Sequence, residues 1–240
     1  MKNIYDNKGF FEAYANMPRS RDGLTQAGEW ELLKSLFPDV SGKKLLDLGC
    51  GYGWHCKYAA QQGAEAVLGI DQSENMIAEA KHRHPDERIT YRVCALQDYE
   101  YPADDFDVVV SNLVLHYVED LSSVYKNVHK TLKKDGVFLV NIEHPVFTAG
   151  VNQSWIMKDD APLYWPVDNY YYPGERVTDF LGHAVTKQHH TLTQILNGLI
   201  ESGFAIEAVH EVEPPIEWRD VMPEEMRRPM MLIVKARKQA

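Results

Sequence analysis

The stretch KKLLDLGCGYGWH, Lys43 to His55, decides the fold of this chain. In it an apolar run leads into three glycines spaced by single residues, Gly49, Gly51 and Gly53. Between a strand and a helix, such glycines allow a tight turn and let the backbone approach a ligand that a β-carbon would push away. We therefore expect this turn to bind a nucleotide-like ligand.

Short apolar and β-branched runs alternate with helical patterns after this turn, which predicts strands joined by crossover helices in a mainly parallel sheet. One helix is predicted over 24–37, and another over 120–136, where apolar residues at helical spacing precede two lysines and a glycine stop. The predicted strands are 43–49, 66–71, 89–94, 106–112, 136–144, 204–213 and 229–237.

The chain of 240 residues can bury a sizeable core, and we expect one domain over 1–240. Its first part, about 1–40, contains an aromatic-rich lead and is expected to cap a ligand site. The alternation of strands and helices is interrupted at about 145–190, a long connection for a compact domain. This insertion is dense in aromatic side chains, and we expect it to be a lid or a substrate-binding element.

The composition disfavours several classes of function. With 35 acidic and 25 basic residues, the net charge of −10 opposes binding to a nucleic-acid backbone, although Arg227 and Arg228 leave room for a local patch. Cys50, Cys56 and Cys94 lack the spacing of a zinc site and the even count of a disulfide framework. No leader and no long apolar run is visible, so we expect a soluble, cytoplasmic protein without a metal.

Asp71 ends the second predicted strand, about twenty residues after the glycine turn, where a carboxylate can bind both hydroxyls of a ribose. The turn and Asp71 together predict an adenosine-type ligand. The dinucleotide fingerprint GxGxxG requires a third glycine where this chain has Trp54, which disfavours NAD. The other pattern, an acidic residue, a spacer and GxGxG, is present from Asp47 to Gly53.

With this DLGCGYG motif the chain resembles the class I S-adenosylmethionine-dependent methyltransferases, specifically their small-molecule branch. GIDQSENMIAEAK (69–81), FDVVVSNLVLHYVED (106–120) and LKKDGVFLV (132–140) resemble the second strand, the fourth strand and the turn into the fifth strand of that family. The resemblance implies a Rossmann-like, seven-stranded α/β sandwich whose sheet is mostly parallel, with an antiparallel last strand. It also implies S-adenosyl-L-methionine as cofactor and S-adenosyl-L-homocysteine as product.

The resemblance further implies which residues hold the cofactor. Asp47, Gly49 and Gly51 would meet its methionine portion, and Asp71 its ribose. Many relatives carry an acidic residue where this chain has Ala95, so adenine recognition would fall to backbone groups and Asp98. The other implied cofactor contacts are Tyr14, Arg19, Cys50, Gln72, Met76, Leu96, Gln97, Asn112, Leu113 and His116.

Methyl transfer is an in-line displacement at carbon, so a base is needed only where the acceptor must lose a proton. His116 and His144 lie at predicted strand ends, and we interpret them as catalytic residues facing the acceptor. The alternative for His116 is a core histidine satisfied by backbone groups. The candidate substrate-binding residues, whose alternative is packing of the insertion or capping of a helix, are Trp155, Tyr170, Tyr171 and His190.

The sequence thus predicts an enzyme that methylates a small, apolar or aromatic acceptor. Because fold does not fix chemistry, two other functions stay open at this point. One is non-catalytic binding of S-adenosylmethionine or a nucleoside, and the other is an NAD-dependent oxidoreductase. The identity of the acceptor atom and the oligomeric state are not specified by the sequence.

Overall fold

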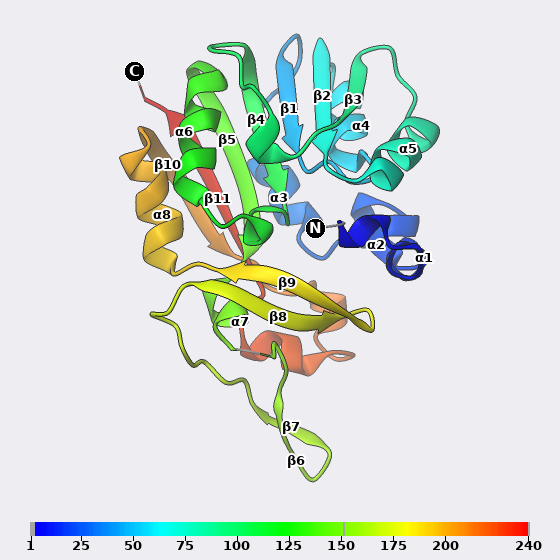
Figure 1. Ribbon diagram of the computed structural model, residues 1–240, viewed down its shortest axis with the longest axis vertical. Coiled ribbons are helices and arrows are strands. Elements are labelled where there is room, and N and C mark those ends of the chain that lie inside the picture. Colours follow the sequence, from blue (N-terminus) through cyan, green and yellow to red (C-terminus); the bar gives the residue numbers. More distant parts are fainter. Residues whose placement is uncertain (1–2, 151, 240) are drawn as a thin grey trace.

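A seven-stranded sheet forms the centre of the computed structural model, which describes residues 3–150 and 152–239 (Figure 1). The strand order is β10-β11-β5-β4-β1-β2-β3, and β11 runs antiparallel to both neighbours while β1 to β5 pair in parallel. The predicted sheet with an antiparallel last strand is therefore confirmed. Its strands are β1 (Lys44–Leu48), β2 (Ala66–Asp71), β3 (Ile89–Val93), β4 (Phe106–Asn112), β5 (Leu132–Glu143), β10 (Phe204–Glu211) and β11 (Met231–Lys238).

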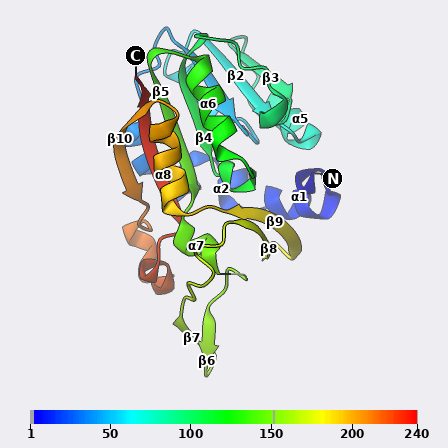
Figure 2. The same ribbon diagram turned by 60° about the vertical axis from the view of Figure 1, so that its left-hand side comes forward.

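Helices cover both faces of this sheet because successive strand residues point to opposite sides. The helices are α3 (Trp30–Leu36), α4 (Trp54–Gln61) and α5 (Glu74–Arg83) in the first group, and α6 (Leu121–Thr131) and α8 (Leu192–Glu201) in the second. Leu45 and Leu46 of β1 are both fully buried, but on opposite faces. Leu45 belongs to the core beneath α3, α4 and α5, and Leu46 belongs to the core beneath α6 and α8. Figures 1 and 2 show α6 and α8 together on one face.

Two predicted helices were wrong in their extent. The helix predicted over 120–136 ends at Thr131, because Leu132 already pairs with Phe106 of β4 and begins β5. The helix predicted over 24–37 is divided into η2 (Leu24–Gln26) and α3. Gly28 lies at this break, where a β-carbon would come within 2.8 Å of the Trp218 ring, so this turn packs closely against the loop between β10 and β11.

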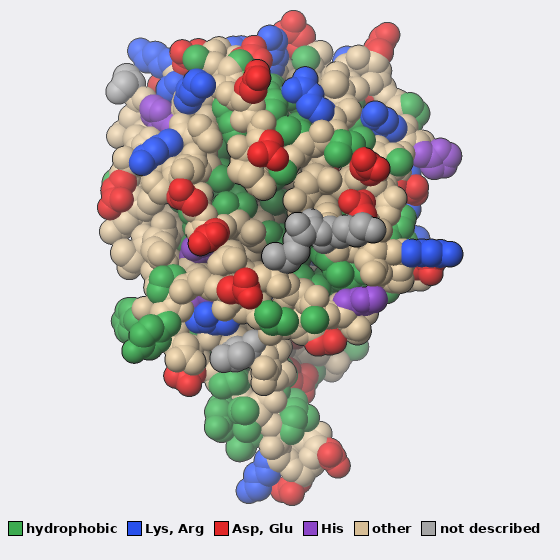
Figure 3. Space-filling view, viewed as in Figure 1, with side chains coloured by type: hydrophobic (Ala, Val, Ile, Leu, Met, Phe, Trp, Pro, Cys, Tyr) green, Lys and Arg blue, Asp and Glu red, His purple; other side chains and the backbone are tan. Residues whose placement is uncertain are grey.

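Two segments surround the carboxyl ends of the strands. The N-terminal cap consists of η1 (Ile4–Asp6), α1 (Lys8–Ala15) and α2 (Pro18–Arg21). The insertion contains α7 (Pro145–Ala149) and two hairpins, β6 (Ile156–Lys158) with β7 (Ala161–Tyr164), and β8 (Gly174–Phe180) with β9 (His183–His189). The hairpin β8–β9 crosses below the sheet in Figure 1, while β6–β7 extends away as an arm on which Figure 3 shows hydrophobic side chains.

Candidate active site

The three glycines of the first turn have three different neighbours. All have positive φ values, a backbone conformation that glycine adopts without strain. A β-carbon at Gly49 would come within 2.3 Å of Val114, and one at Gly53 within 2.5 Å of the Tyr91 hydroxyl. At Gly51, by contrast, nothing lies within 4 Å. Gly49 and Gly53 therefore permit close internal packing, whereas Gly51 leaves space open for a ligand.

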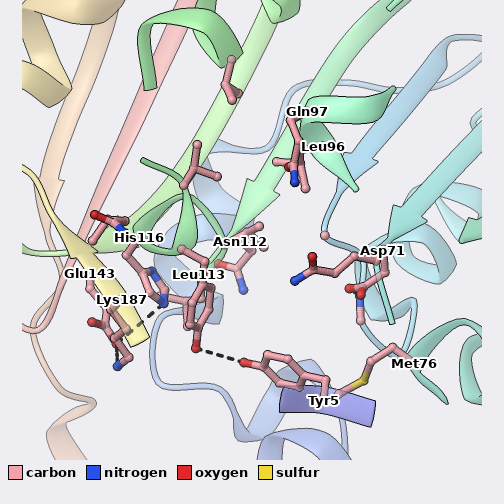
Figure 4. A pocket seen from close by; sticks show the side chains of 18 of the residues that line it. Tyr5, Asp71, Met76, Leu96, Gln97, Asn112, Leu113, His116, Glu143 and Lys187 are labelled. Carbon is pink, nitrogen blue, oxygen red and sulfur yellow. Dashed lines mark hydrogen bonds and ion pairs between the residues drawn. The ribbon is translucent and has the colours of Figure 1, made fainter. Parts of the chain in front are cut away.

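That open space belongs to a cavity of about 810 Å³ at the carboxyl ends of the strands (Figure 4). The volume lies within the range of about 300–1,000 Å³ that ligand pockets occupy. All but three of the predicted cofactor contacts line it, the exceptions being Asp47, Cys50 and Asp98. The contacts that line it are Tyr14, Arg19, Gly49, Gly51, Asp71, Gln72, Met76, Leu96, Gln97, Asn112, Leu113 and His116.

Asp71 is the last residue of β2, and its carboxylate accepts hydrogen bonds from two neighbouring backbone segments. Its Oδ2 accepts a hydrogen bond from the Gly51 amide at 3.0 Å, and its Oδ1 accepts one from the Ser73 amide at 2.9 Å. Burial raises the pKa of Asp71 to about 6, against the effect of these two amides. The carboxylate thus links the glycine turn to the start of α5, and its remaining lone pairs are available to hydroxyl groups in the cavity.

Three predicted contacts lie outside the cavity lining: Asp98, which is exposed at the end of η3 (Leu96–Asp98), and Asp47 and Cys50, which are buried. Asp47 is 1% exposed and accepts a hydrogen bond from the Cys56 thiol at 3.3 Å, on the inner side of the glycine turn. Its burial raises the pKa of this carboxyl group to about 7. Cys50 belongs to the turn itself, and its buried side chain packs against Gly69 of β2.

Arg19 extends from α2 to the cavity, where its positive charge is paired with a carboxylate. Its guanidinium donates a hydrogen bond to Oε1 of Glu29, whose side chain is almost fully buried. The same carboxylate oxygen accepts a bond from Asn112 at the end of β4, at 3.3 Å. Glu29 was not predicted from the sequence, where it appeared only as an ordinary residue of a helix. It joins the cap to the sheet.

The opposite end of the cavity contains His116, which is 3% exposed and lies in η4 (Leu115–Tyr117) after β4. Its Nε2 lies 3.8 Å from Oε1 of Glu143, and its buried Nδ1 has no hydrogen-bond partner among the described residues. Burial is the largest influence and lowers the pKa of His116 to about 4. The imidazole is therefore neutral near pH 7, the form that accepts a proton.

Sequence reasoning missed two charged residues of this end, Glu143 and Lys187. Lys187 of β9 is 5% exposed, and its Nζ lies 2.5 Å from Oε1 of Glu143 at the end of β5. Gln153 completes the cluster by donating to Oε2 of Glu143 at 3.1 Å and accepting from Lys187 at 3.2 Å. Glu143 could have been found from its position at a strand end beside His144, but no local pattern singles out Lys187.

The other two predicted histidines lie outside the cavity lining. His144 caps α7 through Nδ1, which accepts the Val146 amide at 3.0 Å, and its Nε2 lies 3.0 Å from Glu211. His190 makes a hydrogen bond of 2.8 Å from Nε2 to the carbonyl of Val118. The structure therefore gives each of them a supporting contact in place of access to a ligand.

None of the predicted aromatic substrate contacts lines the cavity. Tyr171 is 86% exposed, and the Tyr170 hydroxyl accepts the Leu192 amide at the start of α8. Trp155 packs against Trp165 and the side chains of Arg227 and Arg228, whose charged groups lie over its ring. These arginines hold the insertion and do not form a free basic patch. The aromatic side chains that do line the cavity are Tyr5, Tyr14, Tyr117 and Phe180.

Two features are absent from the described ranges, 3–150 and 152–239. No group of three or more histidine, cysteine, aspartate or glutamate side chains is placed to hold a metal ion there. No helix of these ranges is long and apolar enough to cross a membrane.

Comparisons with known proteins agree with this geometry. The family described as "Methyltransferase domain" matches residues 46–140. An S-adenosylmethionine-dependent methyltransferase from Mesorhizobium loti superposes with a TM-score of 0.83 and 42% identity, covering 90% of this chain and 100% of that chain. A Listeria monocytogenes protein provisionally assigned to the same class gives 0.86 and 44%, covering 90% and 99%. An uncharacterised protein of Haemophilus influenzae is 30% identical over 98% of this chain and 96% of its own length.

Proposed function

We infer the function from one premise: the chain belongs to the class I S-adenosylmethionine-dependent methyltransferases. The predicted family, enzyme class and cofactor are confirmed. We propose that the enzyme methylates a small molecule that has an apolar or aromatic body and a reacting nitrogen or oxygen that carries a hydrogen. The observation that carries this proposal is that one cavity joins the glycine turn and Asp71 at one end to the neutral His116 at the other.

The residues at the first end fit the cofactor. Gly51 leaves a cradle that any side chain would fill, and Asp71 presents a buried carboxylate beside it. Met76 and Leu96 add apolar surface suited to an adenine ring, and both are buried. When bound, S-adenosylmethionine supplies an electrophilic methyl group, whose bond to sulfur breaks with both electrons left on sulfur.

At the other end, His116 is proposed to act as the proton acceptor. Its Nε2 takes the proton that the acceptor loses as a lone pair on nitrogen or oxygen forms the new bond to carbon. Phe180 and Tyr117 provide aromatic wall near this point, and Gln188 of β9 adds a polar group. A mostly non-polar acceptor with one polar reacting atom matches this mixture.

The N-terminal cap and the hairpin β8–β9 are proposed to be lids. The Tyr5 hydroxyl lies 3.1 Å from the Tyr117 hydroxyl, which joins η1 to η4 beside the cavity (Figure 4). Phe180 and Lys187 extend the wall from the hairpin. Segments that cover a site in this way exclude water from the reaction and hold the reacting groups in position.

A binding titration and a transfer assay test the proposal. We expect calorimetry to detect binding of S-adenosylhomocysteine and none of NADH, and a screen of small amines, phenols and alcohols with labelled methyl groups to yield a product. With that acceptor, His116→Ala should lower kcat by about 10²–10⁴-fold, the usual contribution of a general base. His144→Ala is the matched control and should keep full turnover, whereas full turnover by His116→Ala would refute the proposed base.

A further inference from the structure

The charged cluster beside His116 is more elaborate than proton transfer to a single histidine requires. Glu143, Lys187 and Gln153 come from the end of β5, from β9 and from the segment between α7 and β6. Lysine and glutamate are almost never buried unless paired, and removing a charge pair from water is costly. Here the pair is enclosed next to the cavity, and Oε1 of Glu143, the atom bound to Lys187, is also the one nearest His116.

We propose that Lys187 is a positioning residue for methyl transfer: from the inserted hairpin it holds Glu143 opposite Nε2 of His116 and so sets the proton affinity of that histidine. The inference rests on the proposed function of His116 as the proton acceptor. It makes docking of the hairpin β8–β9 a condition for a correctly tuned base, since Lys187 is carried by β9.

The electrostatic arrangement gives the proposal its direction. Glu143 favours the protonated imidazole, whereas Lys187 and His190 oppose it, and the Tyr117 ring lies against the imidazole with ring centroids 4.4 Å apart. With Lys187 present, its ammonium offsets the carboxylate and helps burial to hold the pKa of His116 low. Without Lys187, the carboxylate acts on His116 alone, so the pKa of the imidazole must rise.

The position of Lys187 is fixed by more than its ion pair. Its ammonium lies 5.5 Å from the centroid of the Phe180 ring and 6.0 Å from that of Phe147, within reach of cation–π attraction. Phe180 belongs to β8, the partner of β9 in the hairpin. The lysine is therefore held from the hairpin side as well as from Glu143.

Nuclear magnetic resonance titration of labelled histidines, in protein saturated with S-adenosylhomocysteine, tests the proposal without an acceptor. The His116 signal is assigned from its loss in His116→Gln. We expect Lys187→Met to shift the His116 titration to higher pH, Lys187→Arg to leave it at the wild-type position, and Lys158→Met, which removes an exposed lysine of β6, to have no effect.

The double variant Lys187→Met/Glu143→Gln also removes the carboxylate that Lys187→Met leaves without a partner. It can therefore be titrated even if the single variant fails to fold. It should lose the upward shift, because the group that causes the shift is gone. A wild-type titration in Lys187→Met, or an upward shift that persists in the double variant, would overturn the proposal. Affinity for S-adenosylhomocysteine and labelled methyl transfer report separately on the proposed function, so the two failures are distinguishable.

Discussion

The two ends of the cavity are built in different ways. At the cofactor end, Gly49 and Gly51 after β1 and Asp71 at the end of β2 line the cavity, and Asp71 accepts hydrogen bonds from the Gly51 and Ser73 amides within one loop system. At the proposed acceptor end, the neutral imidazole of His116 from η4 meets long charged side chains from β5 and the insertion, and Lys187 is 44 residues from Glu143 in the chain. We infer a fixed scaffold for the cofactor and, for the proposed acceptor, a wall supplied separately by the insertion, as expected where loops on a rigid scaffold carry function.

The strongest way to break the cofactor end is Gly51→Val. The added side chain would occupy open cavity space, so we expect binding of S-adenosylhomocysteine to fall below detection in a folded protein. Calorimetry measures the loss. Gly42→Val is the matched control, because Gly42 also has positive φ and nothing within 4 Å of a β-carbon but lies outside the cavity lining. Normal binding by Gly51→Val would place the ligand elsewhere.

A smaller effect is expected from Asp71→Ala. Loss of hydrogen bonds to a charged group should weaken binding of S-adenosylhomocysteine by about 1.5–3 kcal/mol. The 2′-deoxy analogue separates this role from the support that Asp71 gives to the turn. Wild-type protein should discriminate against the analogue, and the variant should not. Equal discrimination by both proteins would show that Asp71 does not bind the ribose.

The framework of the cofactor end was accessible from the sequence because it depends on local signals. The glycine spacing, the acidic end of β2 and the alternation of strands and helices each reflect short-range geometry. Asp47 shows the limit of such signals, since the motif does not reveal on which side of the turn its side chain lies. Lys187 reaches Glu143 only through the path of the insertion, and such long-range pairing has no local pattern. The predicted aromatic contacts of the insertion lie outside the cavity lining, and no local pattern separates them from substrate contacts, because packing of the insertion and binding of a substrate require similar side chains.

Asp47→Asn tests the buried support of the turn through the pH dependence of stability. Because burial raises the pKa of Asp47 to about 7, the native state holds a proton that the unfolded state releases near its ordinary value of 3.8. Its contribution to stability is complete below about pH 4 and is lost as pH rises through about 7. Between pH 5 and 8, we expect the melting temperature of the variant to fall less than that of the wild type. A change of 1 kcal/mol in the free energy of unfolding corresponds to about 2–4 °C.

Asp39→Asn is the control for that series, because Asp39 is an exposed carboxylate near β1. It should follow the wild-type pH dependence of melting temperature. Identical curves for Asp47→Asn and the wild type would show that Asp47 has no unusual proton affinity in the folded state.

The smallest effect is expected from Tyr171→Ala. This side chain is 86% exposed and outside the cavity lining, so its removal should change the free energy of unfolding by no more than about 0.5 kcal/mol and leave turnover unaltered. Thermal unfolding and the transfer assay measure both quantities. A marked rise in KM for the acceptor would place Tyr171, which lies between β7 and β8, at the substrate site.

The most direct test of the two-ended cavity is the structure of the complex with S-adenosylhomocysteine. We predict the ribose at Asp71, the adenine beside Leu96 and Gln97, and the sulfur directed toward His116. An adenine found beside His116 and Lys187, with the amino-acid portion at Leu96, would contradict this prediction.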